Sequence, residues 1–137
     1  MNDVLLAKKA SLERCIAQVK QYYREESPLP FEEDHLRQDA ICLNLQRACQ
    51  LAVDMANHVI RVKKLGLPQD SRDAFVLVER AGLITAEQSQ VLQGMVGFRN
   101  VLVHDYRRLD LGVLVEVIEH RVEDLLDFSV SMLTAAE

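Results

Sequence analysis

The sequence predicts an all-α protein, a helical bundle of about five helices, on three observations. Apolar residues recur every three or four positions through most of the 137 residues, which is the period of an amphipathic helix. Aromatic residues make up only 5% of the chain, with no tryptophan, whereas strands draw on aromatic and β-branched residues. The connections between the apolar stretches are short, as in bundles whose consecutive helices pack side by side.

The size and charge of the chain limit the classes of protein that it can belong to. A chain of 137 residues buries a real core, and we expect one domain over residues 1–137. The net charge of −5 means that any nucleic-acid site must depend on a local basic patch. The N-terminus shows no signal-peptide pattern and no apolar run approaches membrane-spanning length. We therefore expect a cytoplasmic protein with no membrane partner.

The first helix is expected from about Asn2 to Arg24, with Asn2 or Asp3 as its N-cap. Pro28 and Pro30 then require a loop. The helix carries one apolar stripe, formed by Val4, Leu5, Leu12, Ile16, Val19 and Tyr23.

The second helix is expected to begin near Glu33 or Asp34 and to run to about Lys64, where Gly66 and Pro68 end it. At ~1.5 Å per residue its length is roughly 45 Å, more than a compact domain needs, so we expect a kink or an end that projects toward a partner. Its apolar positions keep helical spacing: Leu36, Ala40, Leu43, Leu45, Ala48, Ala52, Met55, Ala56, Val59 and Ile60.

A short third helix is expected from Asp70 or Ser71 to Gly82. The following segment Thr85-Ala86-Glu87-Gln88 has the pattern of a capping box, which places the start of the fourth helix at Ala86. The fourth helix then carries Val91, Leu92, Met95, Phe98, Leu102 and Val103.

The last helix is expected after an N-cap at Asp110. One apolar stripe runs along it, formed by Leu111, Leu114, Ile118, Val122, Leu125, Ser129 and Met132.

The stretch from Phe98 to Tyr106 concentrates the chemistry of the chain. Arg99 is a permanent cation whose planar fork matches a phosphate group. His104 accepts or donates a proton near neutral pH, and Tyr106 offers a hydroxyl for hydrogen bonding or modification. An arginine and a histidine are the minimum for cleaving RNA without a metal, because one stabilises charge on phosphorus and the other moves a proton.

The pattern R-x-x-x-x-H-x-Y, read here as RNVLVHDY after Gly97-Phe98, resembles the HEPN superfamily and more narrowly the HepT-like toxins, which are small all-helical ribonucleases. The resemblance implies that Arg99 and His104 are catalytic and that Asn100 supports them. It also implies a homodimer whose motif helices pair to form one composite site, and an RNA substrate such as tRNA. No cofactor is implied.

The same resemblance implies a partner antitoxin, an MNT-type minimal nucleotidyltransferase. Such a partner is similar to enzymes that transfer AMP from ATP to a protein hydroxyl, here that of Tyr106. The added phosphate would repel RNA from the cleft. Arg107 and Arg108 would bind RNA phosphate in the free toxin.

Helical geometry sets conditions on this site. On a continuing helix Arg99 and His104 point about 140° apart, so the helix must loosen near His104 or two chains must contribute. Arg99 and Tyr106, seven residues apart, would share one stripe. Gly94 and Gly97 form a small-residue face, which either admits the motif helix of a second chain or accommodates neighbours within the bundle.

Other interpretations remain open. Arg99 alone is explained as a surface ion-pair partner, and His104 as a histidine favoured at a helix C-terminus. The main functional alternative is a non-catalytic HEPN accessory module that binds a nucleotide or a nucleotidyltransferase partner, and a third is a purely structural bundle.

The remaining polar groups are expected to have ordinary structural roles. The helix dipole explains the cations Arg61, Lys63 and Lys64 at a helix C-terminus. Asp54 and His58 lie on one helical face without a third metal ligand, and Cys15, Cys42 and Cys49 are expected as reduced thiols in or near the core.

Overall fold

A computed structural model describes residues 2–137, and no strand occurs among them. The α-helices are α1 (Asp3–Arg24), α2 (His35–Lys63), α3 (Ser71–Arg80), α4 (Ala86–His104), α5 (Leu111–Glu116) and α6 (Val122–Ala135). Two 3-10 turns, η1 (Phe31–Glu33) and η2 (Tyr106–Arg108), precede α2 and follow α4, and the π-helical segment η3 (Val117–Arg121) joins α5 to α6. Because α5, η3 and α6 follow one another without a break, five helical rods make up the bundle, and the all-α prediction is confirmed.

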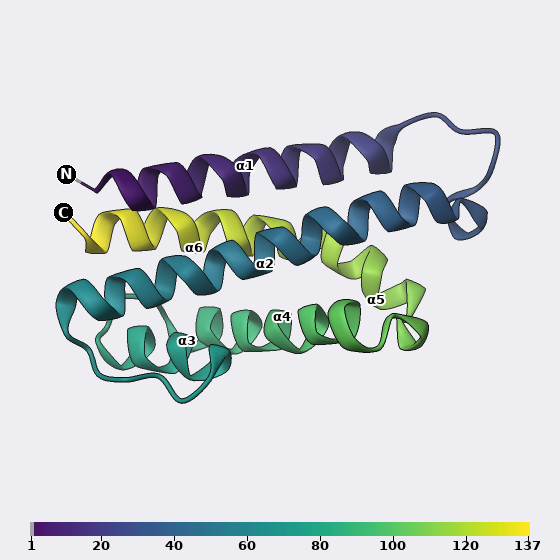
Figure 1. Cartoon of the computed structure of the whole chain (residues 1–137). Coiled ribbons are helices and arrows are strands. Elements are labelled where there is room, and N and C mark those ends of the chain that lie inside the picture. The colour runs from purple at the N-terminus through teal and green to yellow at the C-terminus, as the bar shows by residue number, and fades with distance from the viewer. Residues whose placement is uncertain (1) are drawn as a thin grey trace.

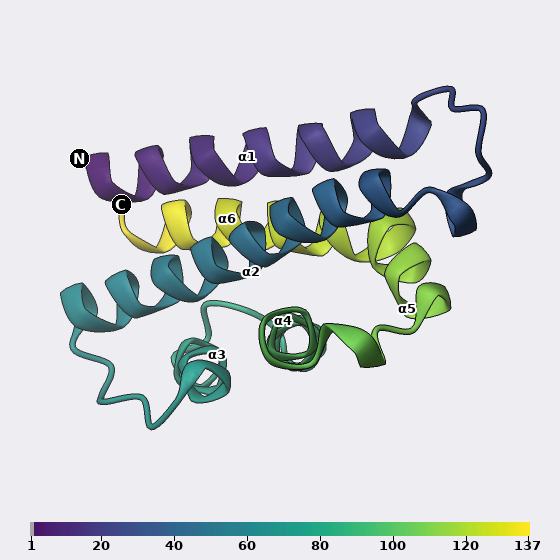
Figure 2. The same cartoon turned by 45° about the vertical axis from the view of Figure 1, so that its right-hand side comes forward.

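The helices form two groups that are inclined to each other. The helices α1, α2 and α6 lie alongside one another, with the start of α1 and the end of α6 at the same end of the molecule (Figure 1). When the molecule is turned, α3 and α4 are seen nearly end-on while α1 and α2 run across the view (Figure 2). The C-terminal end of α4 therefore lies beside the first half of α2, and this is the region that holds the motif.

The helix α2 is the central element, since it contacts α1, α3, α4 and α6. Its length thus serves the bundle itself, and no projecting end is needed to explain it. The edge-to-face pair of Phe75 and Phe128, with ring centroids 5.2 Å apart, joins α3 to α6 within the core. The largest fully buried side chains are Phe75, Phe128, Leu5, Leu12, Ile16, Ile41, Leu45, Met55, Leu92, Leu114, Leu125 and Met132.

The predicted helix starts are confirmed by their side-chain caps. Asn2, Asp34, Asp70 and Asp110 each accept a hydrogen bond from a backbone N–H of the first turn. At α4 the capping box is complete, because Thr85 accepts from the Gln88 backbone and the Gln88 side chain accepts from the Thr85 backbone.

Two helix ends differ from the predictions. The left-handed residue that ends α2 is Lys64 (φ 57°) and precedes the predicted Gly66. The predicted last helix is interrupted by the π-helical turn of η3, which contains one more residue than an α-turn.

Four apolar residues predicted on buried stripes are exposed: Val4, Leu36, Leu43 and Val103. Leu36, which is 83% exposed, lies in the first turn of α2, and Val4 lies in the first turn of α1. Leu43 and Val103 lie at the rims of two cavities between α2 and α4. The periodicity of a sequence predicts which residues share an apolar face of a helix, but the neighbouring helices decide which of those residues are buried.

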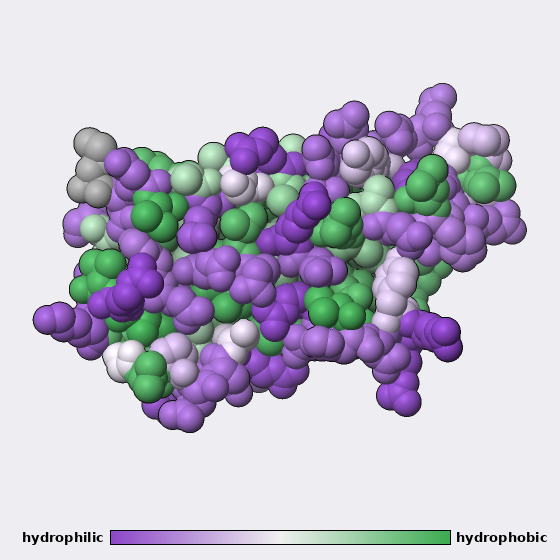
Figure 3. All heavy atoms as spheres, viewed as in Figure 1, coloured by the Kyte–Doolittle hydropathy of each residue, from purple (hydrophilic) through white to green (hydrophobic). Residues whose placement is uncertain are grey.

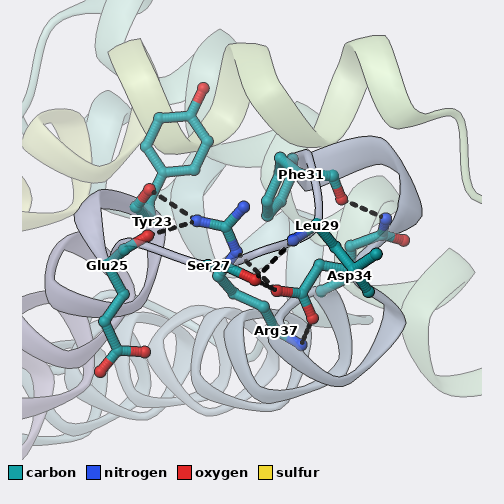
Figure 4. A network of polar contacts seen from close by, with 8 residues as sticks. Tyr23, Glu25, Ser27, Leu29, Phe31, Asp34 and Arg37 are labelled. Atoms are coloured by element: carbon teal, nitrogen blue, oxygen red, sulfur yellow. Dashed lines mark hydrogen bonds and ion pairs between the residues drawn. The ribbon is translucent and has the colours of Figure 1, made fainter.

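Arg37, at the start of α2, holds the proline-containing loop that follows α1 (Figure 4). Its guanidinium donates to the backbone carbonyls of Glu25 (2.9 Å) and Tyr23 (3.3 Å), and its Nε lies 3.3 Å from an oxygen of Asp34. The Phe31 ring covers the guanidinium at 5.0 Å. The side chain is only 10% exposed, so Arg37 acts as an internal clamp between α1 and α2.

The exterior has the character of a polar bundle. On the face shown in Figure 3, hydrophilic residues predominate and hydrophobic ones are scattered among them. Across residues 2–137, no helix is both long and apolar enough to cross a bilayer. The three cysteines are free and buried.

Candidate functional site

The motif divides between two elements. Arg99, Asn100 and His104 belong to α4, which stays helical through His104 and ends there because Asp105 adopts φ −151° and ψ 52°. Tyr106 begins the 3-10 turn η2. The expectation that Arg99 and Tyr106 share one helical stripe is therefore wrong, since the backbone leaves the helix between them.

Arg99 and His104 line one cavity of 440 Å³ between α2 and α4. Val103 of α4 and Gln46, Arg47 and Gln50 of α2 complete its lining. Five residues along a helix correspond to about 7.5 Å, so the two motif residues border different parts of this cavity. A single chain thus brings both side chains to the same cavity without any loosening of α4.

The Arg99 guanidinium is oriented by amides. It donates to Gln50 Oε1 at 2.7 Å and to Asn100 Oδ1 at 3.0 Å. Among residues 2–137 no carboxylate forms an ion pair with it, so Arg99 keeps a positive charge that faces the cavity. The alternative of Arg99 as an ordinary surface ion-pair partner therefore finds no support, and Asn100 stands in direct contact with the residue that it was predicted to support.

Gln50 is itself held by Asp54, whose carboxylate accepts a hydrogen bond of 2.9 Å from the Gln50 amide nitrogen. This bond leaves the amide oxygen of Gln50 for Arg99, which fixes the orientation of the amide. Asp54 also lies 3.9 Å from Lys8, whereas His58 contacts Arg61 at 3.1 Å. Asp54 and His58 thus have separate partners, and no group of three potential metal ligands occurs in the described part of the chain.

His104 is exposed at the end of α4 and is one of the residues that line the cavity. Within residues 2–137 its side chain takes part in no hydrogen bond or ion pair. Its imidazole is therefore available to exchange protons with a ligand in the cavity. A histidine at a helix C-terminus is also favoured by the helix dipole, and that explanation stands beside the functional one.

A second cation approaches Arg99 from α3. The Arg72 guanidinium lies across α4 at Gly97, where a Cβ atom would come within 2.8 Å of its Nη2 atom. Arg72, Arg99 and Asn100 share a smaller cavity of 190 Å³. Gly97 therefore has an explanation within the chain, whereas Gly94 faces open space and remains available to a second chain.

Tyr106 turns away from Arg99 toward α2, where its hydroxyl donates a hydrogen bond to the Asp39 carboxylate. The ring lines a separate cavity of 140 Å³ with Asp39, Cys42, Leu43, Gln46 and Leu102. Burial and the hydrogen bond to Asp39 raise the pKa of the Tyr106 hydroxyl well above its ordinary value, so the phenol is neutral near pH 7. The residue is nevertheless 42% exposed, which leaves it accessible.

The other basic residues differ in their relation to the site. Arg107 and Arg108 are exposed on η2, and Arg108 pairs with Asp105 at 3.2 Å. The group of Arg61, Lys63 and Lys64 lies at the opposite end of α2, away from the end of α4 (Figure 1). The local basic patch that the net charge requires consists of Arg47, Arg72 and Arg99, one each from α2, α3 and α4.

Four residues of this site were not predicted from the sequence: Asp39, Arg47, Gln50 and Arg72. One signal was present, because Asp39, Leu43, Gln46 and Gln50 follow the i, i+4, i+7, i+11 spacing of one helical face. Nothing in the sequence indicates that α4 lies beside this face. Arg72 gave no signal, since its position depends on how α3 crosses α4.

The fold and the motif define the class to which this bundle belongs. The family described as ribonuclease HepT-like matches residues 12–132, so the chain belongs to the HepT-like ribonuclease family. The predicted resemblance to HEPN proteins of the HepT type is thereby confirmed.

A similar protein of established name is the mRNA nuclease HepT of Shewanella oneidensis, which is 44% identical over 128 residues, or 93% of this chain and 95% of that protein. A solved structure of the tri-AMPylated HEPN toxin of Shewanella oneidensis with its MNT antitoxin is also similar, with a TM-score of 0.91 and 42% identity over 98% of this chain and 99% of that one. A toxin–antitoxin structure with AMP-PNP gives a TM-score of 0.89 and 42% identity, over 96% and 99% of the two chains.

Proposed function

We propose that this chain is the toxin of a toxin–antitoxin pair, a metal-independent endoribonuclease that acts as a single HEPN-like domain in the cytoplasm. Its partner would be an MNT-type nucleotidyltransferase that neutralises it by transferring AMP to Tyr106. The observation that carries this proposal is the shared cavity of Arg99 and His104 in a member of the HepT-like family. A relative that covers nearly the same length bears the name mRNA nuclease.

In the proposed reaction the ribose 2′-hydroxyl of RNA attacks the adjacent phosphorus. His104 acts as general base or general acid, and Arg99 stabilises the charge that develops on the phosphate oxygens. The Gln50 and Asn100 amides hold the Arg99 guanidinium in place for this role. The products would be a 2′,3′-cyclic phosphate and a free 5′-hydroxyl.

One histidine begins the reaction in only one protonation state, whereas the reaction needs a group that takes a proton and a group that gives one. A homodimer with paired α4 helices would supply two copies of His104 and of Arg99 to one cleft. The open space at Gly94 leaves that part of α4 free for such pairing.

RNA would be held by the basic patch of Arg47, Arg72 and Arg99, with Arg107 and Arg108 at its edge. Although the net charge of the chain is −5, these cations from three helices next to the cavity would attract RNA phosphates locally. The family resemblance implies tRNA as the substrate, whereas the relative is named for mRNA, so both RNAs are substrates to test.

The proposed neutralisation depends on Tyr106. Its exposed part is accessible to a partner enzyme, and its cavity shares Gln46 with the Arg99–His104 cavity. AMP attached here would bring negative charge and bulk to the entrance of the RNA site. The relative's complex with an MNT antitoxin and its AMPylated state support the choice of partner and chemistry.

The test compares growth after induction of the chain alone with growth after induction of Arg99→Ala and His104→Ala. Arg80→Ala and His35→Ala, which remove an exposed arginine and an exposed histidine elsewhere, serve as matched controls. We expect arrest with the wild type and both controls and none with the two site variants, with helix content equal by circular dichroism.

Purified wild-type chain should also cut tRNA or mRNA in the presence of EDTA and leave cyclic phosphate ends. If the site variants remain as toxic as the wild type, the ribonuclease site is refuted. If the wild type neither arrests growth nor cuts RNA, the accessory-module alternative replaces the enzyme.

A further inference from the structure

We propose that Asp39 accepts the phenolic proton of Tyr106 when AMP is transferred to that tyrosine. The toxin would then contribute a catalytic carboxylate to its own modification. This inference rests on the proposed function, in which Tyr106 is the AMP acceptor and a nucleotidyltransferase delivers ATP.

The contact joins two parts of the chain that are 67 residues apart. Asp39 lies in the second turn of α2, and its carboxylate Oδ1 accepts the hydrogen bond that the Tyr106 hydroxyl of η2 donates. Both residues line the same small cavity, and both are exposed to solvent. A partner enzyme can therefore bring the α-phosphate of ATP to the hydroxyl from solvent while the hydroxyl stays in contact with Asp39.

The surroundings leave Asp39 as the group able to take the proton. The other titratable residue lining this cavity is Cys42, and burial raises the pKa of its thiol, so Cys42 is protonated near neutral pH. Of the charged residues next to Tyr106 in the chain, Asp105 is paired with Arg108. The Asp39 carboxylate is already in contact with the proton that must leave.

The proposed step balances without any other reactant. The Tyr106 oxygen forms a bond to the α-phosphorus of ATP, and the bond from that phosphorus to the bridging oxygen of the β-phosphate breaks. Pyrophosphate departs with the electron pair of the broken bond. The phenolic proton passes to Asp39 and then to solvent, and no group is oxidised or reduced.

The same contact has a consequence after transfer. The modified oxygen has no hydrogen to donate, and its phosphodiester carries a negative charge that Asp39 repels. A cavity of 140 Å³ is also smaller than the pockets that hold small-molecule ligands. The modified side chain therefore leaves the cavity and extends toward solvent and the RNA site.

The test measures the initial rate of AMP transfer from ATP to the full-length chain by its nucleotidyltransferase partner, by intact mass, from pH 6 to pH 10. The variants are Asp39→Asn, which keeps an acceptor for the hydrogen bond but takes no proton, and Tyr106→Phe, which removes the acceptor hydroxyl. Glu33→Gln, an exposed acidic residue of η1, is the matched control. Co-purification with the partner and circular dichroism establish that each variant is folded and bound.

We expect no transfer to Tyr106→Phe and a rate constant for Asp39→Asn about a hundredfold below that of the wild type at pH 7, with KM unchanged. The difference should narrow toward pH 10 as hydroxide replaces the missing base. Wild-type rates with Asp39→Asn, or a loss that lies only in KM and is the same at every pH, would overturn the role of Asp39 while leaving Tyr106 as acceptor. Normal transfer to Tyr106→Phe would instead overturn the proposed modification site, and this inference with it.

Discussion

The Arg99 guanidinium of α4 donates a 2.7 Å hydrogen bond to the Gln50 side chain of α2, and this contact orients the central cation of the cavity. Asp54 in turn holds the Gln50 amide. A chain of two side chains on α2 therefore positions a residue of α4. Of the two residues Asp54 and His58, which share one helical face, only Asp54 takes part in this support for Arg99.

Replacing Gln50 tests this support. In Gln50→Leu the acceptor for Arg99 is removed while the size of the side chain is nearly kept, so Arg99 should adopt several orientations. We expect the kcat of RNA cleavage to fall about tenfold, since a hydrogen bond to a charged group contributes roughly 1.5 kcal/mol. Gln18→Leu on the exposed side of α1 should retain the wild-type rate. Equal rates for the two variants would show that Asn100 alone positions Arg99.

Replacing Arg47 tests the basic patch. The side chain is exposed at the rim of the main cavity, and no ion pair engages it in the described residues. In a His104→Ala background, which prevents cleavage, Arg47→Ala should weaken RNA binding. The slope of log affinity against log salt should decrease by about 0.7 for each RNA phosphate that the variant no longer binds. Fluorescence anisotropy at several salt concentrations measures this, with Arg80→Ala as control, and an unchanged slope would exclude Arg47 from the RNA path.

Alanine at the two glycines of α4 should have different effects. Gly94→Ala meets no atom within 4 Å in one chain, so we expect the free energy of unfolding of the monomer to rise by about 0.5–1 kcal/mol from helix propensity. Gly97→Ala displaces the Arg72 guanidinium and should weaken RNA binding with a smaller change in stability. Thermal unfolding and anisotropy measure the two effects.

Gly94→Ala also tests the proposed dimer. If the Gly94 face of α4 packs against a second chain, the added methyl group should promote dissociation in analytical ultracentrifugation. A dimer of unchanged affinity would place the pairing surface elsewhere.

The clamp between α1 and α2 should respond to the removal of Arg37. In Arg37→Ala two backbone carbonyls lose their side-chain donor and the Asp34 carboxylate loses its ion-pair partner, so we expect the free energy of unfolding to fall by about 2–3 kcal/mol. Arg24→Ala, an exposed arginine in the last turn of α1, should change it by less than about 0.5 kcal/mol. Urea denaturation measures both, and a small effect of Arg37→Ala would mean that the loop holds without its clamp.

Asp34 should contribute to the pH dependence of stability. The Ser27 hydroxyl and the Arg37 backbone N–H donate to its carboxylate and hold its pKa below the ordinary value of 3.8. A carboxyl whose pKa is lower in the folded state stabilises the fold above its unfolded pKa, and this contribution disappears as the pH falls through the folded pKa. We therefore expect Asp34→Asn to show a shallower decline of stability below about pH 4 than the wild type. If the free energy of unfolding of the variant and of the wild type fell equally with pH, Asp34 would not contribute to the pH dependence.

The sequence alone determined the helical class, the capped helix starts and the stretch that carries the chemistry. These features depend on neighbours in the chain: the apolar period, the cap residues from Asn2 to Asp110, and the short spacing between Arg99, His104 and Tyr106. Interactions between residues that are close in the chain can be predicted from the sequence of that segment alone.

Only the tertiary structure decided which residues meet across the bundle. The packing of α2 beside the end of α4 brought Gln50 to Arg99 and Asp39 to Tyr106, and the crossing of α3 brought Arg72 to Gly97. Tyr106 separated from the Arg99 stripe because the backbone turns at Asp105, and Leu36 and Leu43 stayed exposed because no helix covers them. These outcomes depend on helix contacts between residues far apart in the chain, and the period of a single helix contains no information about them.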